Sequence, residues 1–197
     1  MDITEIANSL LNGEVALLPT DTVYGLAASP LHEKAVNEIY SLKQRPRTQN
    51  LPIMVASVKD LEKMGVEISL LAQKILDSEL VPGDITLVLG FKDKPVLAWL
   101  QGREEVAIRI PNHQNLLEIL GKTGPLLVTS ANKHGNPNMS KHIAEVLADL
   151  NGLPGVVVEG KVGENVPSTI VNCRVNPPII ERQGRILNED ILNVLNS

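Results

Sequence analysis

The fold class is first indicated by the stretch Glu14-Val15-Ala16-Leu17-Leu18-Pro19-Thr20-Asp21-Thr22-Val23-Tyr24-Gly25. Residues 15–18 form a short apolar run, which is typical of a strand that is covered on both faces. Upstream of it, Asp2 and Glu5 form a capping-box signature, and Asn12-Gly13 ends the helix that they begin. A helix followed at once by a buried strand indicates an α/β layer fold.

The same alternation continues to the end of the chain. A second helix is predicted from Ser29-Pro30 through Leu42, with Pro46 as its terminator. Further helices are predicted at residues 61–80, 113–120, 140–150 and 190–195. Further strands are predicted at residues 53–55, 85–91, 106–110, 126–129, 156–158, 169–171 and 179–180. The last two strands are closely spaced and split by Asn176-Pro177-Pro178, which favours an antiparallel portion, so we expect a twisted mixed sheet with flanking helices.

Composition limits the possible functions. The 197 residues are predicted to form one domain, 1–197. The net charge is −5 and only 2% of the residues are aromatic, so a basic protein that stacks nucleobases on aromatic side chains is disfavoured. There is no positively charged leader, and no apolar run approaches the roughly 20 residues that span a bilayer. We therefore expect a cytoplasmic protein without membrane contact.

Several familiar catalytic motifs are excluded. Gly121-Lys122-Thr123 imitates the end of a Walker A loop, but the first glycine of that motif would fall at position 116, which is Leu116. The four histidines have no metal-ligand spacing, so no protein-held metal is expected. Cys173, the one cysteine, lies in a run of strand residues, where a buried structural thiol is preferred to a nucleophile.

Polar side chains follow two of the predicted strands. Thr20, Asp21, Thr22 and Tyr24 come after the first strand, and Ser130-Ala131-Asn132 comes after the strand at 126–129. In open α/β sheets ligands bind outside the carboxyl ends of strands, so these hydroxyl and amide groups could face one cleft. Ordinary turn chemistry explains the same residues equally well, because Ser, Thr, Asn and Asp cap turns for local reasons. Position alone leaves both interpretations open.

Cations occur at two further kinds of position. Lys43, Arg45 and Arg47 lie at the end of a predicted helix, where they either stabilise the helix dipole or clamp an anion. Arg109 lies inside a predicted buried strand and must find a compensating anion. A paired structural arginine is the preferred interpretation of Arg109, and a ligand contact is the alternative.

A third group lies near the end of the chain. Ser168-Thr169 begins a predicted strand, and Arg182 precedes Gly184, where backbone can come close to a neighbour or ligand. Taken together, the cations, hydroxyls and amide include no evident general base or covalent nucleophile. Such a set suits phosphate chemistry, in which positioning and charge compensation supply most of the catalysis.

An ordered set of motifs runs through nearly the whole chain. Its members are Leu18-Pro19-Thr20-Asp21-Thr22-Val23-Tyr24-Gly25-Leu26, Lys43-Gln44-Arg45-Pro46, Pro82-Gly83 before Thr86, Arg109 with Pro111, Ser130-Ala131-Asn132, Pro167-Ser168-Thr169 and Arg182-Gln183-Gly184. In this order and spacing they resemble the signatures of the YrdC family of threonylcarbamoyl-AMP synthases. One such motif would be weak, but the ordered set is highly specific.

This resemblance implies a fold and an activity. The family fold is a twisted mixed sheet with a large concave, locally positive cavity. The implied reaction condenses L-threonine, bicarbonate and ATP to threonylcarbamoyl-AMP and pyrophosphate. A separate transferase then moves the threonylcarbamoyl group to tRNA, and a weak direct tRNA contact is a further expectation.

The resemblance also implies roles for individual residues. It places ATP at Lys43, Arg45, Ser130, Asn132 and Arg182, with Lys43 and Arg45 as the catalytic cations. It places L-threonine at Thr22, Arg109 and Ser168. Mg²⁺ is expected on the triphosphate, with no metal held by the protein itself.

One segment departs from the family pattern. Many members have Asn-Pro-Leu-Ile-Val-His after the Lys-x-Arg motif, whereas this chain has Leu51-Pro52-Ile53-Met54-Val55-Ala56, so one threonine contact of the family lacks its histidine here. We expect the short, single-domain form of the family. Two rival functions stay open: a same-fold paralogue that binds RNA or nucleotide without making this adenylate, and a non-catalytic nucleotide-binding subunit that regulates partners.

Overall fold

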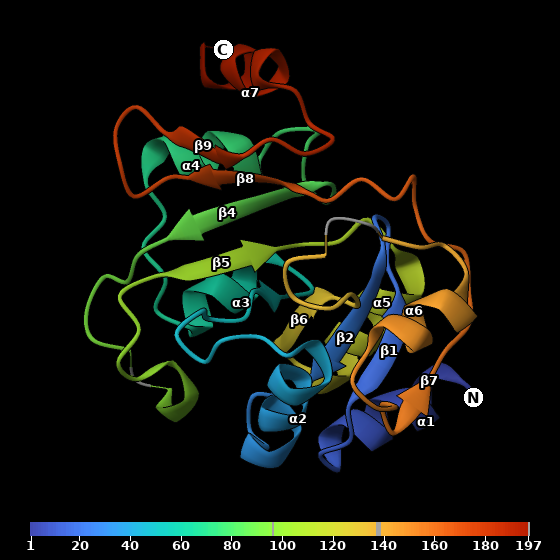
Figure 1. Cartoon of the computed structure of the whole chain (residues 1–197). Helices are drawn as coiled ribbons and strands as arrows, with labels where there is room; N and C mark the ends of the chain where they lie inside the picture. The colour runs from blue at the N-terminus through green and yellow to red at the C-terminus, as the bar shows by residue number, and fades with distance from the viewer. Residues whose placement is uncertain (96, 137–138, 197) are drawn as a thin grey trace.

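The computed structural model describes residues 1–95, 97–136 and 139–196 and contains one nine-stranded sheet (Figure 1). The strand order is β7-β1-β2-β6-β3-β5-β4-β8-β9. The strands are β1 (Ala16–Pro19), β2 (Tyr24–Ala28), β3 (Ile53–Met54), β4 (Ile85–Leu89), β5 (Val106–Arg109), β6 (Leu126–Ser130), β7 (Val156–Val157), β8 (Thr169–Asn172) and β9 (Ile179–Arg182). The helices are α1 (Ile3–Leu11), α2 (Glu33–Lys43), α3 (Val58–Lys63), α4 (Leu70–Leu76), α5 (Gln114–Thr123), α6 (Ile143–Asp149) and α7 (Asn188–Asn196), with a 3₁₀ helix η1 at Ala98–Leu100.

The sheet is mixed, which confirms the predicted fold class. The pairs β1–β7, β3–β5 and β4–β8 are parallel, whereas β1–β2, β2–β6, β3–β6, β4–β5 and β8–β9 are antiparallel. The β8–β9 pair is the antiparallel portion that Asn176-Pro177-Pro178 indicated. In Figure 1, β8, β9, α4 and α7 gather at one end of the sheet, and β1, β7 and α1 lie at the other.

Each face of the sheet carries a hydrophobic cluster, and the side chains of successive strand residues point to opposite faces. At β1, Val15 and Leu17 join the larger hydrophobic cluster, and Ala16 and Leu18 join the smaller one. Ile6 and Leu10 of α1 and the buried residues of α5 complete the smaller cluster. The buried apolar residues of α2, α3, α4, α6 and α7 belong to the larger. None of the helices in the described part of the chain is long and apolar enough to cross a membrane.

The single helix expected over residues 61–80 is wrong. Helix α3 ends at Lys63 and α4 begins at Leu70, and between them Gly65 has a φ of +72°. A positive φ ends a right-handed helix and suits glycine. Just after Gly65, the chain forms an isolated antiparallel bridge between Val66 and Phe91. The apolar pattern continued through this break because both sides pack on the same core.

The start of α2 also differs from the prediction. The helix begins at Glu33 with His32 as its N-cap, whereas the sequence placed its start at Ser29-Pro30. The hydroxyl oxygen of Ser29 instead accepts a hydrogen bond from the Leu31 N–H at 3.4 Å, as part of a turn. Gln44, in the left-handed conformation, ends the helix before Pro46 is reached.

Strand β2 was not predicted. It is fully buried and pairs with both β1 and β6, although its sequence is Tyr-Gly-Leu-Ala-Ala. Glycine and alanine have low strand propensity. At Gly25, an added Cβ would lie 3.0 Å from Val128 of the neighbouring strand, so the small residue permits close packing.

Candidate active site

A row of side chains crosses one face of the sheet. Residues that pair across neighbouring strands project to the same face. Met54 of β3 pairs with Arg109 of β5. Thr86 of β4 pairs with Ile170 of β8, and Ile170 in turn pairs with Arg182 of β9. Because β4 and β5 are themselves paired, this row brings together groups that lie far apart in the sequence.

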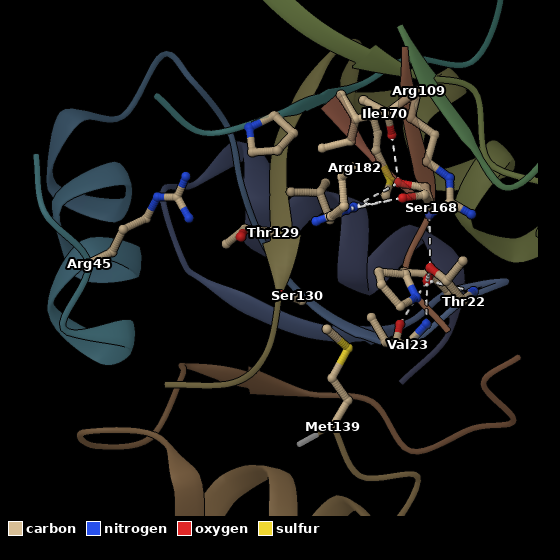
Figure 2. A pocket seen from close by; sticks show the side chains of 16 residues that line it. Thr22, Val23, Arg45, Arg109, Thr129, Ser130, Met139, Ser168, Ile170 and Arg182 are labelled. Carbon is tan, nitrogen blue, oxygen red and sulfur yellow. Dashed lines mark hydrogen bonds between the residues drawn. The ribbon is translucent and has the colours of Figure 1, made fainter. Parts of the chain in front are cut away.

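The row lines a cavity of about 200 Å³. Figure 2 shows Arg45, which follows α2, on the opposite side of this cavity from Thr22 and Ser168. Six of the residues to which the family resemblance gave a role line it: Thr22, Arg45, Arg109, Ser130, Ser168 and Arg182. The other lining residues are Thr20, Val23, Pro52, Met54, Thr86, Val128, Thr129, Met139, Pro167 and Ile170.

The turn after β1 is held by the hydroxyl of Thr20, which is buried. Thr20 Oγ1 donates to the Val23 carbonyl at 2.7 Å and accepts from the backbone N–H groups of Thr22 at 3.1 Å and Val23 at 3.2 Å. It also lies 3.0 Å from Thr22 Oγ1. Turn chemistry and a cleft-facing hydroxyl, which the sequence offered as alternatives, therefore occur together here.

Arg109 is 5% exposed and is paired with carboxylates, as the preferred interpretation of its position required. Its Nη2 donates to Asp84 Oδ1 at 2.8 Å and forms an ion pair with Asp21 Oδ1 at 2.9 Å. Its Nε donates to the Gly83 carbonyl at 3.0 Å, and its Nη1 donates to Thr22 Oγ1 at 2.8 Å. Burial raises the pKa of Asp84, and the positive charge of Arg109 opposes that rise. Most of the Arg109 fork is thus engaged inside the protein.

Ser168 and Arg182 lie beside Thr86. Arg182 donates from Nε and Nη2 to the Ser168 carbonyl at 3.2 and 2.9 Å, and Nη2 also donates to Ser168 Oγ at 3.2 Å. Ser168 Oγ lies 2.7 Å from Thr86 Oγ1. Burial lowers the pKa of Arg182, and the nearby charge of Arg109 lowers it further. An anion bound between these two arginines would relieve their repulsion, and the hydroxyl groups beside them could also contact it.

Lys43 lies behind the cavity and supports the loop at Ser130–Asn132. It is 2% exposed. Its Nζ donates to the Ser130 carbonyl, to the Asn132 carbonyl at 2.6 Å and to Asn132 Oδ1 at 3.3 Å. Burial lowers the pKa of Lys43 to about 8, with Arg45 acting in the same direction and Asp149 opposing it. Because an ammonium has three N–H donors, these contacts engage all of them.

Asn132 lines an adjoining hollow of about 230 Å³. Met139 lines both this hollow and the cavity. Asn132 Oδ1 accepts from Ser130 Oγ at 2.6 Å, and its Nδ2 donates to the Asn136 carbonyl at 2.6 Å. The predicted residues therefore meet in one region, where Asn132 borders the neighbouring hollow and Lys43 contacts the loop from behind.

Sequence reasoning did not assign Thr86 or Asp84 to the site. Both have a signal in the sequence, because each is a polar residue in or beside the apolar run of β4 and is buried. The argument that drew attention to Arg109, a polar group inside a buried strand, applies equally to them. Ala56, where many family members have histidine, packs against the smaller hydrophobic cluster and is not among the lining residues.

The cysteine and the histidines lie outside the lining of this cavity. Cys173 is buried, and burial raises its pKa to about 11, which agrees with a structural thiol. His32 contacts the Leu11 carbonyl through Nε2 at 2.6 Å, and His113 Nδ1 accepts from the Leu116 N–H at 3.3 Å. Within residues 1–95, 97–136 and 139–196, no group of three or more His, Cys, Asp or Glu side chains is placed to hold a metal ion.

The sequence of this chain is similar to those of known proteins. The Sua5/YciO/YrdC family model, described as "Telomere recombination", matches residues 8–184. A threonylcarbamoyl-AMP synthase of Bacillus subtilis is 35% identical over 98% of this chain and 56% of its own length. One of Pyrococcus abyssi is 33% identical over 96% of this chain and 56% of its own length.

A solved structure has the same fold. The crystal structure of Pyrococcus abyssi Sua5 complexed with L-threonine matches with a TM-score of 0.86 and 31% identity, over 98% of this chain and 56% of that one. The chain thus spans little more than half the length of these relatives. Because the family model covers most of the sequence and the fold agrees, this chain belongs to the Sua5/YciO/YrdC family.

Proposed function

We propose that this chain catalyses the condensation of L-threonine, bicarbonate and ATP to threonylcarbamoyl-AMP and pyrophosphate, as a step in tRNA modification. The observation that carries the proposal is the single cavity in which Arg45, Arg109 and Arg182 accompany the hydroxyls of Thr22 and Ser168. The synthase names of the relatives and the threonine in the Pyrococcus abyssi structure support it.

The threonine end of the proposed site contains Thr22, Arg109 and Ser168. Arg109 has its Nε and Nη2 engaged with Gly83 and Asp84, so it offers a ligand only part of its guanidinium fork. Arg182 lies beside Ser168 and adds a second positive charge at this end. The carboxylate of an amino acid would bring the opposite charge to this pair of arginines.

The nucleotide end contains Arg45, Ser130 and Asn132. A cavity of about 200 Å³ is smaller than the roughly 300–1,000 Å³ of a usual small-molecule site. We place the triphosphate and ribose partly in the adjoining hollow at Asn132, past the loop that Lys43 holds. In this proposal Lys43 acts by fixing that loop, and Arg45 faces the phosphates.

The proposed reaction requires charge compensation at the α-phosphorus. The threonine amine and bicarbonate form a carbamate and release water. A carbamate oxygen then bonds to the α-phosphorus as the bond to pyrophosphate breaks. Negative charge moves from the carbamate oxygen to the leaving pyrophosphate, while the other oxygens on the phosphorus stay negative. Arg45 and Arg182 compensate this charge from the protein side. Mg²⁺ enters with the triphosphate as part of the substrate and shares the charge of the leaving pyrophosphate.

The test is a mass-spectrometric search for threonylcarbamoyl-AMP after incubation of the chain with ATP, threonine and bicarbonate. We expect the adenylate only when all three are present. ATP binding without threonine-dependent pyrophosphate release would overturn the proposal and support a non-catalytic nucleotide-binding subunit.

A matched pair of variants tests the phosphate contact. Arg45→Ala should lower the rate of threonine-dependent pyrophosphate release by about 100-fold, because it removes a cation from the developing charge. Arg47→Ala is the control, since Arg47 lies over the Tyr40 ring at 4.9 Å and is not among the lining residues. Equal rates for the two variants would contradict the role given to Arg45.

A further inference from the structure

The guanidinium of Arg45 is oriented by main-chain carbonyl groups. Its Nε donates to the Gln49 carbonyl at 3.3 Å, and its Nη2 donates to the Asn50 carbonyl at 3.1 Å. Within residues 1–95, 97–136 and 139–196, no carboxylate forms an ion pair with it, whereas Arg109 is paired with two. A neutral carbonyl group orients an N–H donor without cancelling its charge, so Arg45 keeps its positive charge for a ligand.

The two carbonyl contacts use one edge of the planar guanidinium. Nε and Nη2 form that edge, and Nη1 and Nη2 form the other. Among the residues that the structure describes, Nη1 of Arg45 has no hydrogen-bond partner. Figure 2 shows Arg45 reaching from the end of α2 toward the cavity. The second edge is therefore available to bind two oxygens of one phosphate group.

Tyr40 holds the carbonyl group that Nε of Arg45 contacts. The Tyr40 hydroxyl donates to the Gln49 carbonyl at 3.0 Å. With the Arg45 contact, this bond fills both lone pairs of the Gln49 carbonyl oxygen. Tyr40 is itself buried in the larger hydrophobic cluster, so its hydroxyl has a fixed position. The direction of the Arg45 side chain thus depends on a group anchored in the core.

Two further contacts fix the ends of this arrangement. The Tyr40 carbonyl accepts a hydrogen bond from the Arg45 backbone N–H at 2.9 Å, which the left-handed Gln44 permits at the end of α2. Arg103 Nη1 donates to the Leu51 carbonyl at 3.3 Å. The main chain at residues 49–51 is therefore held on both sides of the point where Arg45 contacts it.

We propose that Tyr40 is a positioning residue that aims the free edge of Arg45 at a phosphate of the nucleotide, and that Arg103 assists by holding the same loop. Neither residue is among those that line the cavity, so both act through Arg45. The inference rests on the proposed function, because it concerns the nucleotide substrate of that same site.

The first measurement is equilibrium binding of ATP with Mg²⁺, and separately of L-threonine, by calorimetry. Tyr40→Phe removes the hydroxyl and keeps the ring that Arg47 covers. It should weaken ATP binding about three- to tenfold and leave threonine binding unchanged, because only the phosphate contact loses its orientation. Wild-type affinity for ATP in Tyr40→Phe would overturn the inference, and so would an equal loss for both ligands.

A control variant loses a comparable hydrogen bond elsewhere. The Thr123 hydroxyl donates to the Ile119 carbonyl at 3.1 Å in α5, and neither residue lines the cavity. Thr123→Val should therefore bind ATP as the wild-type chain does. A loss of ATP affinity equal to that of Tyr40→Phe would show a general effect of lost stability and would overturn the inference.

A double-mutant cycle separates positioning from a merely structural role. In the Arg45→Ala background, Tyr40→Phe should change the affinity for ATP by less than about 1.5-fold, because the hydroxyl acts through Arg45. If Tyr40→Phe weakens ATP binding by the same factor with and without Arg45, Tyr40 does not act through that side chain and the inference fails.

Arg103 provides a second test if Tyr40→Phe fails to fold. Arg103→Met removes the donor to Leu51 and should weaken ATP binding about two- to fivefold, with no further loss in the Arg45→Ala background. Arg103→Lys keeps a charged donor and should restore binding to within about twofold. Wild-type ATP affinity in Arg103→Met would contradict the inference. A wild-type chain that binds neither ATP nor threonine would instead overturn the proposed function itself.

Discussion

Asp84 forms one ion pair with the buried Arg109 of the cavity and another with the exposed Arg185. One of its oxygens accepts from Arg109 at 2.8 Å, and the other contacts Arg185 Nη1 at 3.2 Å. Asp84→Ala leaves Arg109 with Asp21 as its carboxylate partner, so we expect the free energy of unfolding to fall by about 2–4 kcal/mol. Asp84→Asn keeps an acceptor and should cost less. Urea unfolding of both variants measures the difference, and equal stability of Asp84→Ala and wild type would contradict the buried pair.

The buried ammonium of Lys43 makes the free energy of unfolding depend on pH. Its pKa is about 8 in the folded chain against an ordinary value of 10.5, so the folded state holds fewer protons between these values. Stability therefore rises with pH in this window. Relative to Lys43→Met, the wild-type free energy of unfolding should rise by about 1 kcal/mol between pH 8 and pH 9.

Urea unfolding of the two proteins at both pH values checks this pH dependence. Cys173, whose pKa is raised to about 11, is present in both proteins, so its titration cancels in the difference. A difference between the proteins that stays constant with pH would contradict the buried position of the ammonium.

At the scale of elements, the segment after β9 is pressed against the start of β8. An added Cβ at Gly184 would lie 2.3 Å from the Pro167 carbonyl oxygen and 2.5 Å from the Thr169 nitrogen. Gly184→Ala should therefore displace Ser168, destabilise the chain by about 1–3 kcal/mol and abolish threonine binding. Gly121→Ala is the control, because nothing lies within 4 Å in helix α5 and alanine there should stabilise by about 0.5–1 kcal/mol. Thermal unfolding and calorimetry test both, and normal threonine binding by Gly184→Ala would refute the contact.

The elements also show what could be predicted from the sequence. Strand β1 and helix α1 were predictable because an apolar run and a capping box are local signals. Strand β2 was not, since its small residues become a strand only between β1 and β6. The break between α3 and α4 lies at Gly65, and the Val66–Phe91 bridge that follows it joins segments distant in sequence. Such tertiary partners override local preference.

The candidate site also has features with a local sequence signal and features that depend on tertiary structure. Polar residues at strand ends and within strands signalled Thr22, Arg109 and Ser168, and the ordered motifs grouped them with the helix-end cations. Which of these side chains contact one another could not be predicted, because that depends on register. The Thr86–Ser168 contact exists only because β4 and β8 pair in parallel with Thr86 opposite Ile170.

At the scale of the whole molecule, the acidic charge bears on contact with tRNA. The chain has 18 Lys and Arg against 23 Asp and Glu. We expect tRNA to bind the free chain more weakly than about 10⁻⁴ M at 0.15 M salt, because the net charge of −5 opposes the approach of the phosphate backbone. Fluorescence anisotropy with labelled tRNA over a salt series tests this. Micromolar binding that weakens steeply with salt would favour the RNA-binding paralogue.

The row from Met54 to Arg182 exists only once β3, β5, β4, β8 and β9 have all joined in register. A ligand that recognises this row binds finished molecules and ignores partly assembled ones. Occupancy at 100 times the dissociation constant would then add about 2.7 kcal/mol to the stability of the native chain. In a cell, abundance of that ligand would thereby protect newly made copies from proteolysis, so the supply of the ligand would help to set the amount of the protein.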